Sequence, residues 1–267
     1  MPDLTYAQKL ELAGRVTAPA LRQVIGALAL SPGSRGLDAG CGTGQHAPWL
    51  AAAVGPTGSV VGLDVSADNL NAANHAEPRR QCCFVQGDLL RLPFAERAFD
   101  WLWCADTFWP AAVLSDPVAA LKDLSRVVRP GGSIALAYWS SQMLLPGYPG
   151  LEARLNAAFT TAVPYLGEVP PQHHFLRASG WLRAAGLRAL QPRTFLAELQ
   201  APLAPNLRAG LAYCLEMLWG QLRGRISGSD WEEYHRLCDA ESESFIGDLS
   251  DYYGFVGYTL FRGVVRV

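Results

Sequence analysis

The sequence has little charge. Charged residues make up 17% of its 267 residues, against a usual share of roughly 25%. The net charge is −2, and Lys and Arg are scattered without forming a run. Binding to nucleic acid or to an anionic membrane surface needs clustered positive charge. We therefore expect neither as a partner.

Metal motifs and long apolar stretches are also missing. The six cysteines form no Cys-x-x-Cys pair and show no metal-ligand spacing, so we expect free thiols and no bound metal. No apolar run reaches the length of a membrane span, and the segment from Met1 to Tyr6 does not resemble a signal peptide. The sequence predicts a soluble, cytoplasmic protein that is a monomer or a homodimer.

A glycine-rich turn is the feature around which the chain is organised. A short buried strand is predicted over 35–39 and a helix over 46–53. Gly40, Gly42 and Gly44 lie between them at alternate positions, where they allow positive φ and the close approach of a ligand. Such a unit begins a doubly wound α/β sheet, in which ligands bind at the carboxyl ends of the strands.

The chemistry around this turn favours a cationic ligand. The pattern Gly42-x-Gly44-x-x-Ala47 also fits a nicotinamide- or flavin-binding turn. However, Asp38 precedes the first glycine by two residues, where its carboxylate would crowd a pyrophosphate and attract a positive charge.

A second acidic residue ends the next predicted strand. Residues 60–65 form a short apolar run, and Asp64 lies 20 residues after Gly44. A carboxylate at this point can accept hydrogen bonds from both hydroxyls of a ribose. Helix capping is the alternative role for Asp64, but Ser66 is better placed to cap the following helix.

Further elements follow at the spacing of alternating strands and helices. Strands are predicted over 82–88, 99–106 and 133–139, with a helix over 117–128 and an Arg-Pro-Gly-Gly turn at 129–132.

Four segments in this order resemble the class I S-adenosylmethionine-dependent methyltransferases. They are Asp38-x-Gly-x-Gly-x-Gly, Asp64, Gly87-Asp88…Pro93-Phe94…Phe99-Asp100, and Leu124-x-Arg-Val-Val-Arg-Pro-Gly-Gly. The resemblance covers 36–140 and is to the branch of quinone-biosynthesis C-methyltransferases and small-molecule methyltransferases. It implies an α/β fold with a doubly wound, seven-stranded, mostly parallel sheet, an antiparallel last strand and helical lid insertions.

The resemblance also implies S-adenosylmethionine as cofactor, with S-adenosylhomocysteine as its product. In this sequence the matching cofactor site consists of Asp38, Gly40, Cys41, Gly42, Gly44, His46, Asp64, Val65, Asp88, Leu89 and Cys104. Asp88 would meet the adenine amino group, and the amide of Leu89 a ring nitrogen.

The domain organisation follows from the same resemblance. We expect one methyltransferase domain over 1–267. Its parts would be an N-terminal helical cap at 1–34, a cofactor-binding core at 35–140, a substrate lid at 141–174 and 200–253, and the rest of the core at 175–199 and 254–267.

The acceptor site is less defined. Methyl transfer is a direct displacement that depends on alignment, and a base is needed only for an acceptor that must lose a proton. Asp106 is the first candidate for acceptor contact, with a turn residue as the alternative. His173 is a candidate base or substrate contact, with an exposed loop histidine as the alternative. Aromatic residues that could line a pocket are Trp103, Phe108, Trp109, Trp139, Tyr165 and Trp219.

The predicted function is therefore methyl transfer to a small, apolar or aromatic acceptor. No Asn-Pro-Pro-Tyr or Asp-Pro-Pro-Tyr follows the fourth strand, and no Asp-Asn pair follows Trp139, which excludes amide or base-nitrogen methylation and a catechol-type metal site. Two alternatives stay open. One is a nicotinamide-dependent oxidoreductase, although the sequence lacks Tyr-x-x-x-Lys. The other is a non-catalytic protein that binds S-adenosylmethionine.

Overall fold

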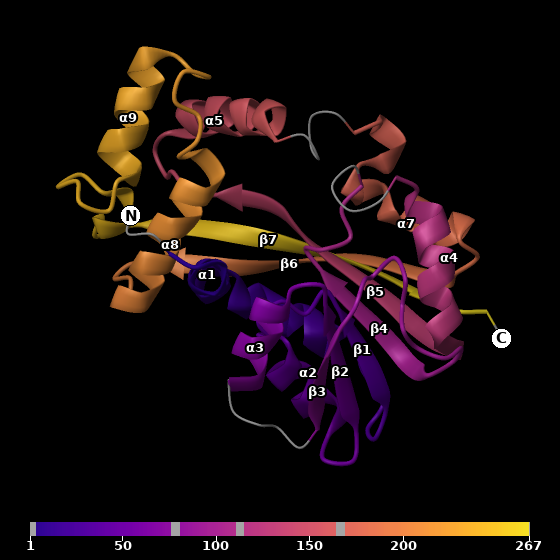
Figure 1. Cartoon of the computed structure of the whole chain (residues 1–267). Coiled ribbons are helices and arrows are strands. Elements are labelled where there is room, and N and C mark those ends of the chain that lie inside the picture. Colours follow the sequence, from indigo (N-terminus) through magenta and orange to yellow (C-terminus); the bar gives the residue numbers. More distant parts are fainter. Residues whose placement is uncertain (1–3, 76–80, 111–114, 164–168, 267) are drawn as a thin grey trace. The chain divides into compact units, whose positions relative to one another are not determined.

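The computed structural model describes residues 4–75, 81–110, 115–163 and 169–266 (Figure 1). The α-helices (α), 3-10 helices (η) and strands (β) occur in the order α1 (Tyr6–Ala27), β1 (Arg35–Ala39), α2 (Ala47–Val54), β2 (Ser59–Asp64), α3 (Ala67–His75), β3 (Cys82–Gln86), β4 (Phe99–Ala105), α4 (Pro117–Val127), β5 (Val128–Met143), α5 (Pro149–Ala162), η1 (Pro171–His173), η2 (Phe175–Arg177), α7 (Ala178–Ala184), β6 (Arg188–Gln200), α8 (Pro205–Trp219), α9 (Gly228–Cys238), η3 (Ile246–Asp248) and β7 (Tyr253–Val264).

The strands form a seven-stranded sheet in the order β3-β2-β1-β4-β5-β7-β6. β1 lies in parallel between β2 and β4, and β3 and β5 extend the parallel part. β7 is antiparallel. Accordingly, Thr259 contacts Thr194 on β6, whereas Arg262, further along β7, contacts Gln191, which comes earlier on β6. The predicted fold class is confirmed.

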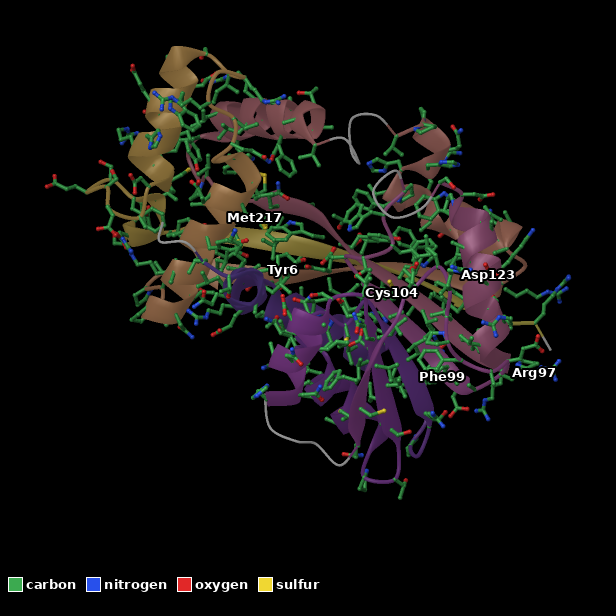
Figure 2. The ribbon with its side chains drawn as sticks, in the orientation of Figure 1. Tyr6, Arg97, Phe99, Cys104, Asp123 and Met217 are labelled. Carbon is green, nitrogen blue, oxygen red and sulfur yellow. The ribbon has the colours of Figure 1, made fainter. Side chains whose placement is uncertain are left out.

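The central strands are buried because both faces of a parallel sheet are covered by helices. β1 is buried from Gly36 to Ala39, and α2 packs against β2. The edge strands β3 and β6 are partly or largely exposed. Figure 2 shows Phe99 and Cys104 near opposite ends of β4, which is buried along almost all of its length.

Helix α4 begins as the sequence predicts. Asp116 is its N-cap, and its Oδ1 accepts hydrogen bonds from the backbone N–H groups of Val118 (2.8 Å) and Ala119 (3.1 Å). Pro117 occupies the first helical position, where no N–H is required. The local signals are sufficient here because a cap depends on residues only two or three positions apart.

The predicted turn at 129–132 and the predicted strand 133–139 are wrong in their bounds. β5 runs from Val128 to Met143 and includes the Arg-Pro-Gly-Gly segment as an irregularity. Phe99 pairs with Val128, but Trp101, two residues later, pairs with Ser133. The intervening glycines exchange backbone hydrogen bonds with Val265. Pairing with the distant last segment therefore keeps this stretch within the sheet.

The chain divides into two compact units. One comprises 1–20, 140–169 and 196–257, and the other comprises 21–139, 170–195 and 258–267. The first contains most of the two segments expected to form a lid, and the second contains the glycine turn. The single-domain organisation and the lid remain predictions.

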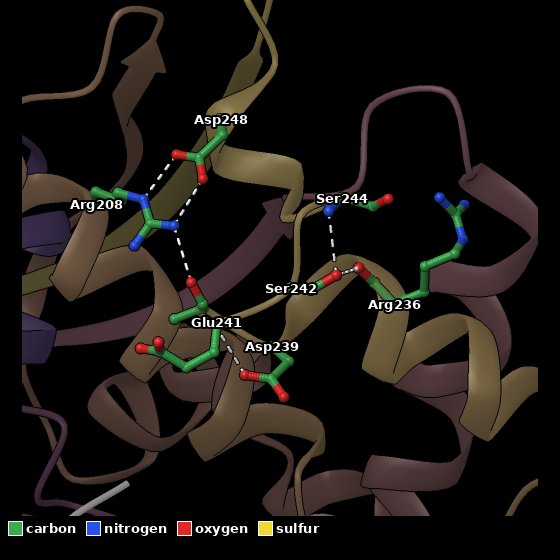
Figure 3. A network of polar contacts seen from close by, with 8 residues as sticks. Arg208, Arg236, Asp239, Glu241, Ser242, Ser244 and Asp248 are labelled. Carbon is green, nitrogen blue, oxygen red and sulfur yellow. Dashed lines mark hydrogen bonds and ion pairs between the residues drawn. The ribbon is translucent and has the colours of Figure 1, made fainter.

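Within the first unit, an arginine joins helix α8 to the segment that follows α9 (Figure 3). The Arg208 guanidinium donates to both carboxylate oxygens of Asp248 at 2.6 Å and to the carbonyl oxygen of Ala240 at 2.9 Å. Its charged carbon lies 4.6 Å from the centre of the Phe245 ring. This paired arrangement fixes the guanidinium plane and connects α8 to η3.

We expect Gly40→Ala to destabilise the protein by about 2–4 kcal/mol, because it combines overpacking with a disfavoured backbone. A Cβ at Gly40, where φ is +79°, would lie 2.4–2.7 Å from the side-chain atoms of Thr107. Gly224→Ala is the matched control: φ is +76°, but apart from its chain neighbours no atom lies within 4 Å of its Cβ. It should cost only about 1 kcal/mol. Urea unfolding gives both values, and equal losses would contradict the steric argument.

Candidate functional site

The glycine turn has the backbone that the sequence predicts. The φ angles of Gly40, Gly42 and Gly44 are +79°, +53° and +74°. The N–H groups of Gly40 and Cys41 both donate to the carbonyl oxygen of Leu63, at 2.7 and 2.9 Å, which fastens the turn to the end of β2. The turn is therefore held by the neighbouring strand and presents glycines where a ligand can approach closely.

Asp38 lies at the base of this turn and is completely buried. Among the described residues, neither of its carboxylate oxygens has a hydrogen-bond partner. Burial, with a smaller contribution from the Asp64 carboxylate, raises the pKa of Asp38 to about 8. An unpaired buried carboxylate is costly, so this residue is the strongest indication that a positively charged partner completes the site.

Asp64 ends β2 and is already engaged with the protein. Its Oδ2 accepts from the N–H of Gly42 at 2.9 Å. Its Oδ1 accepts from the N–H of Ser66 and from the side-chain amide of Asn69. Ser66 in turn accepts from the N–H of Asn69 at 3.2 Å, as expected of the helix cap. Asp64 thus has both a local structural role and, on Oδ2, capacity for one more donor.

His46 immediately precedes α2 and is held by tryptophans. The Trp103 indole N–H donates to His46 Nδ1 at 3.3 Å, and the Trp49 ring lies 5.7 Å from the imidazole. This packing lowers the pKa of His46 to about 4. The ring is therefore neutral near pH 7 and carries its proton on Nε2, because Nδ1 is the acceptor.

The segment expected to meet an adenine follows β3. Asp88 is exposed, and its Oδ1 accepts from the N–H of Leu90 at 2.8 Å. Leu89 is buried, whereas Val65, next to Asp64, is 71% exposed. The N–H of Gly87 donates to the carbonyl oxygen of Asp64 at 3.0 Å, which brings the two segments together. An uncovered valine at this edge offers an apolar surface to a flat ring.

Two cysteines lie close to the turn without being reactive. Cys41 and Cys104 are both buried. Burial raises the pKa of each thiol well above its usual range, and the nearby Asp38 carboxylate adds to the effect. Because a thiolate is the reactive form, neither thiol is set up to act as a nucleophile.

Asp106 follows β4 and faces solvent on one side. Tyr258, on β7, donates its hydroxyl to Asp106 Oδ2 at 2.5 Å, and the backbone N–H of Trp139 donates to Oδ1 at 2.9 Å. Loss of water on the protein side raises the pKa of Asp106 to about 6, and these two bonds act in the opposite direction. Thr107, the next residue, donates its hydroxyl to the carbonyl oxygen of Gly40 at 3.3 Å. Asp106 is therefore adjacent to the glycine turn.

Sequence reasoning missed Tyr258. It lies 152 positions from Asp106 in the chain, within an alternating apolar strand that gives no signal of a polar contact. Only the position of β7 beside β5 reveals the pair.

The structure describes His173 and Trp219 but not Tyr165. His173 ends η1, and its charge acts on Asp116, at the start of α4. His174 accepts from the N–H of Leu176 and packs against Phe175. Trp219 lies in the other unit, and Tyr165 is outside the described residues.

The described ranges contain neither a membrane-spanning helix nor a cluster of metal ligands. No helix there is both long and apolar enough to cross a membrane. In the same residues, no three His, Cys, Asp or Glu side chains come together in a way that could hold a metal ion.

In a comparison with known protein families, residues 37–136 match a family described as a methyltransferase domain. A demethylmenaquinone methyltransferase of Lysinibacillus sphaericus is 33% identical over 143 residues, which are 53% of this chain and 58% of the relative. The chain thus spans little more than half the length of this relative.

Solved structures share the fold. A chain in the complex between the Haloferax volcanii Trm112 methyltransferase activator and a putative methyltransferase is 18% identical, with a TM-score of 0.59 over 98% of this chain and 94% of that one. The [4+2]-cyclase SpnF is 21% identical, with a TM-score of 0.54 over 92% and 81%. At these identities the likeness concerns the fold alone.

We expect the ligand-free protein to lose stability as pH rises from about 4 to about 8. The folded pKa of Asp38 is about 8, above the ordinary value of 3.8, so over this interval the folded state holds a proton that the unfolded state has released. Asp38→Asn should remove this component of the pH dependence and raise the Tm at pH 8. Calorimetric melting at pH 5 and pH 8 measures both. If the difference in Tm between pH 5 and pH 8 is the same in the variant as in the wild type, the assignment is refuted.

Proposed function

We propose that the chain is a class I S-adenosylmethionine-dependent methyltransferase that transfers a methyl group to a small, apolar or aromatic acceptor. When bound, S-adenosylmethionine supplies a methyl group on a positively charged sulfur. The observation that carries the proposal is Asp38, a buried carboxylate without a described partner beneath a turn of positive-φ glycines.

Asp38 fits a cation better than a phosphate. A positive group above the turn would be attracted by the carboxylate across a region of low dielectric. It would also favour the ionised form of Asp38, whose pKa without ligand is about 8. Ligand binding near neutral pH is then coupled to the release of a proton. A pyrophosphate would instead meet repulsion, which argues against a nicotinamide cofactor.

The remaining cofactor residues have complementary roles. Asp64 Oδ2 would accept one ribose hydroxyl beside the Gly42 N–H, a more limited role than accepting both hydroxyls. Val65 would cover one face of the adenine, while Asp88 and the Leu89 amide would meet its edge. His46, neutral and donating from Nε2, would face the amino-acid end of the ligand.

The acceptor is proposed as a class. The relative from L. sphaericus is named for demethylmenaquinone, which supports an apolar, ring-containing acceptor. That alignment covers 53% of this chain, and the lid at 141–174 and 200–253 remains a prediction.

Calorimetric titration with S-adenosylhomocysteine, run beside NAD, tests the cofactor assignment. We expect S-adenosylhomocysteine alone to bind, and to bind more tightly at pH 8 than at pH 6, because Asp38 must lose its proton. Binding of NAD alone, in a folded sample cleared of carried-over ligand, would replace the proposal with an oxidoreductase. Binding without turnover of any acceptor would favour a non-catalytic protein.

Asp64→Ala should weaken S-adenosylhomocysteine binding by about 1–3 kcal/mol, the usual cost of leaving hydrogen-bond partners unsatisfied. Because Asp64 also accepts three bonds from the protein, the variant should melt at a lower temperature as well. Ser66→Ala is the control: it removes the cap of α3, at a cost of about 1 kcal/mol in stability, and should leave the affinity unchanged. Equal affinities for the two variants would exclude Asp64 from the site.

A further inference from the structure

We propose that Asp106 and Tyr258 form a proton-accepting pair for the methyl acceptor, and that this acceptor carries a hydroxyl group on an aromatic ring. The inference rests on the proposed function and names the acceptor chemistry of the same site.

The first observation is the position of Asp106. It follows β4, which pairs with β1 so that Asp38 lies opposite Trp103. The hydroxyl of Thr107 bonds to the carbonyl oxygen of Gly40. The Asp106 carboxylate therefore lies at the edge of the sheet where ligands of such folds bind, beside the glycine turn.

The second observation is how firmly the carboxylate is held. Asp106 has a φ of +48°, uncommon for a residue other than glycine, and its N–H donates to the carbonyl oxygen of Ala137 at 3.0 Å. The Tyr258 hydroxyl and the Trp139 N–H each bond one carboxylate oxygen. Each oxygen can accept a second donor, so the pair can take an acceptor hydroxyl without losing its own bonds.

The third observation concerns the groups around the carboxylate. Among the described residues, the titratable groups that interact with Asp106 include Tyr258 on β7, Tyr138 on β5 and Cys104 on β4. Burial raises the pKa values of Tyr138 and Cys104 well above their usual ranges. Asp106, with a pKa of about 6, changes charge between pH 5 and 8, and the Tyr258 hydroxyl donates to it. A base with a pKa near the working pH is effective in proton transfer.

The surroundings favour a flat ring. The half-exposed Trp139 ring lies 6.4 Å from the Tyr258 ring at an angle of 37°. The half-exposed Trp109 packs edge-on against Tyr138, with centroids 5.1 Å apart. An aromatic acceptor can pack against such surfaces while its hydroxyl meets the carboxylate.

The proton balance is simple. The acceptor O–H bond breaks, and the proton binds an Asp106 oxygen. The electron pair left on the acceptor forms its bond to the methyl carbon, while the pair of the broken carbon–sulfur bond stays on sulfur. The exposed side of Asp106 then returns the proton to solvent.

Two probes of matched shape test the pair with tritium-labelled methyl groups: 2-naphthol, which must lose a proton, and 2-naphthalenethiol, which is already largely ionised at pH 8. We expect Asp106→Asn to lower transfer to 2-naphthol at least ~100-fold and to change transfer to the thiolate by less than about threefold, because only the first reaction needs a base. Asparagine tolerates the positive φ, so the fold should persist.

Tyr258→Phe provides the second variant. It removes a hydrogen bond that lowers the pKa of Asp106, so the acid limb of the 2-naphthol pH profile, near pH 6 in the wild type, should move to higher pH. A purely structural contact would lower the activity without moving that limb. S-adenosylhomocysteine binding should be unchanged in both variants.

The outcomes separate the two proposals. An unchanged 2-naphthol rate in Asp106→Asn, or an unmoved limb in Tyr258→Phe, overturns the base. No transfer to 2-naphthol by a wild-type protein that binds S-adenosylhomocysteine overturns the acceptor class alone. A wild-type protein that fails to bind S-adenosylhomocysteine overturns the proposed function itself.

Discussion

The parallel pairing of β1 between β2 and β4 determines where the three carboxylates of the candidate site lie. Because parallel strands end at the same edge of a sheet, Asp38, Asp64 and Asp106 are all brought to one side of the glycine turn. Glycines make this pairing possible: a Cβ at Gly36 would lie 2.0 Å from the Trp101 ring, and one at Gly62 would lie 2.5 Å from Phe84. The position of the site therefore depends on glycines that let neighbouring side chains pack closely against β1 and β2.

Three carboxylates at one edge create an electrostatic problem, and the structure treats each one differently. Asp64 accepts hydrogen bonds from three donors, and Asp106 from two. Asp38 has no described donor, and burial favours its protonated form. Its burial therefore makes the ligand-free state less stable near neutral pH than it would otherwise be. The protein thus loses stability without ligand at the same residue that would strengthen the binding of a cationic ligand.

The fold by itself does not decide the reaction. A [4+2]-cyclase has a similar fold, so the chemistry must be argued from individual groups. Here the cofactor end of the site depends on the backbone of the turn and on Asp38. The acceptor end depends on Asp106, which is oriented by β5 and β7. The cofactor end lies in a recognisable glycine motif, whereas Tyr258 at the acceptor end lies in an apolar strand that carries no motif.

Local sequence was enough for features that depend on neighbouring residues. It predicted β1 with the correct bounds, the positive φ of the glycine turn and the start of α4 at Pro117, because glycine and proline act on the backbone within a few positions. The seven-stranded fold and the cofactor class came from four motifs in order. It failed at 129–132, where pairing with Val265 keeps a turn-like segment in the sheet.

The tertiary structure alone decided which polar groups meet. It showed that Asp38 has no described partner, that Asp64 already serves the helix start, and that Tyr258 bonds Asp106 across 152 positions of chain. The sequence pattern of a strand shows which of its side chains are apolar, but it does not show which other strand pairs with that strand. Sheet order therefore determined the environment of each carboxylate, while the sequence determined only that the carboxylates were there.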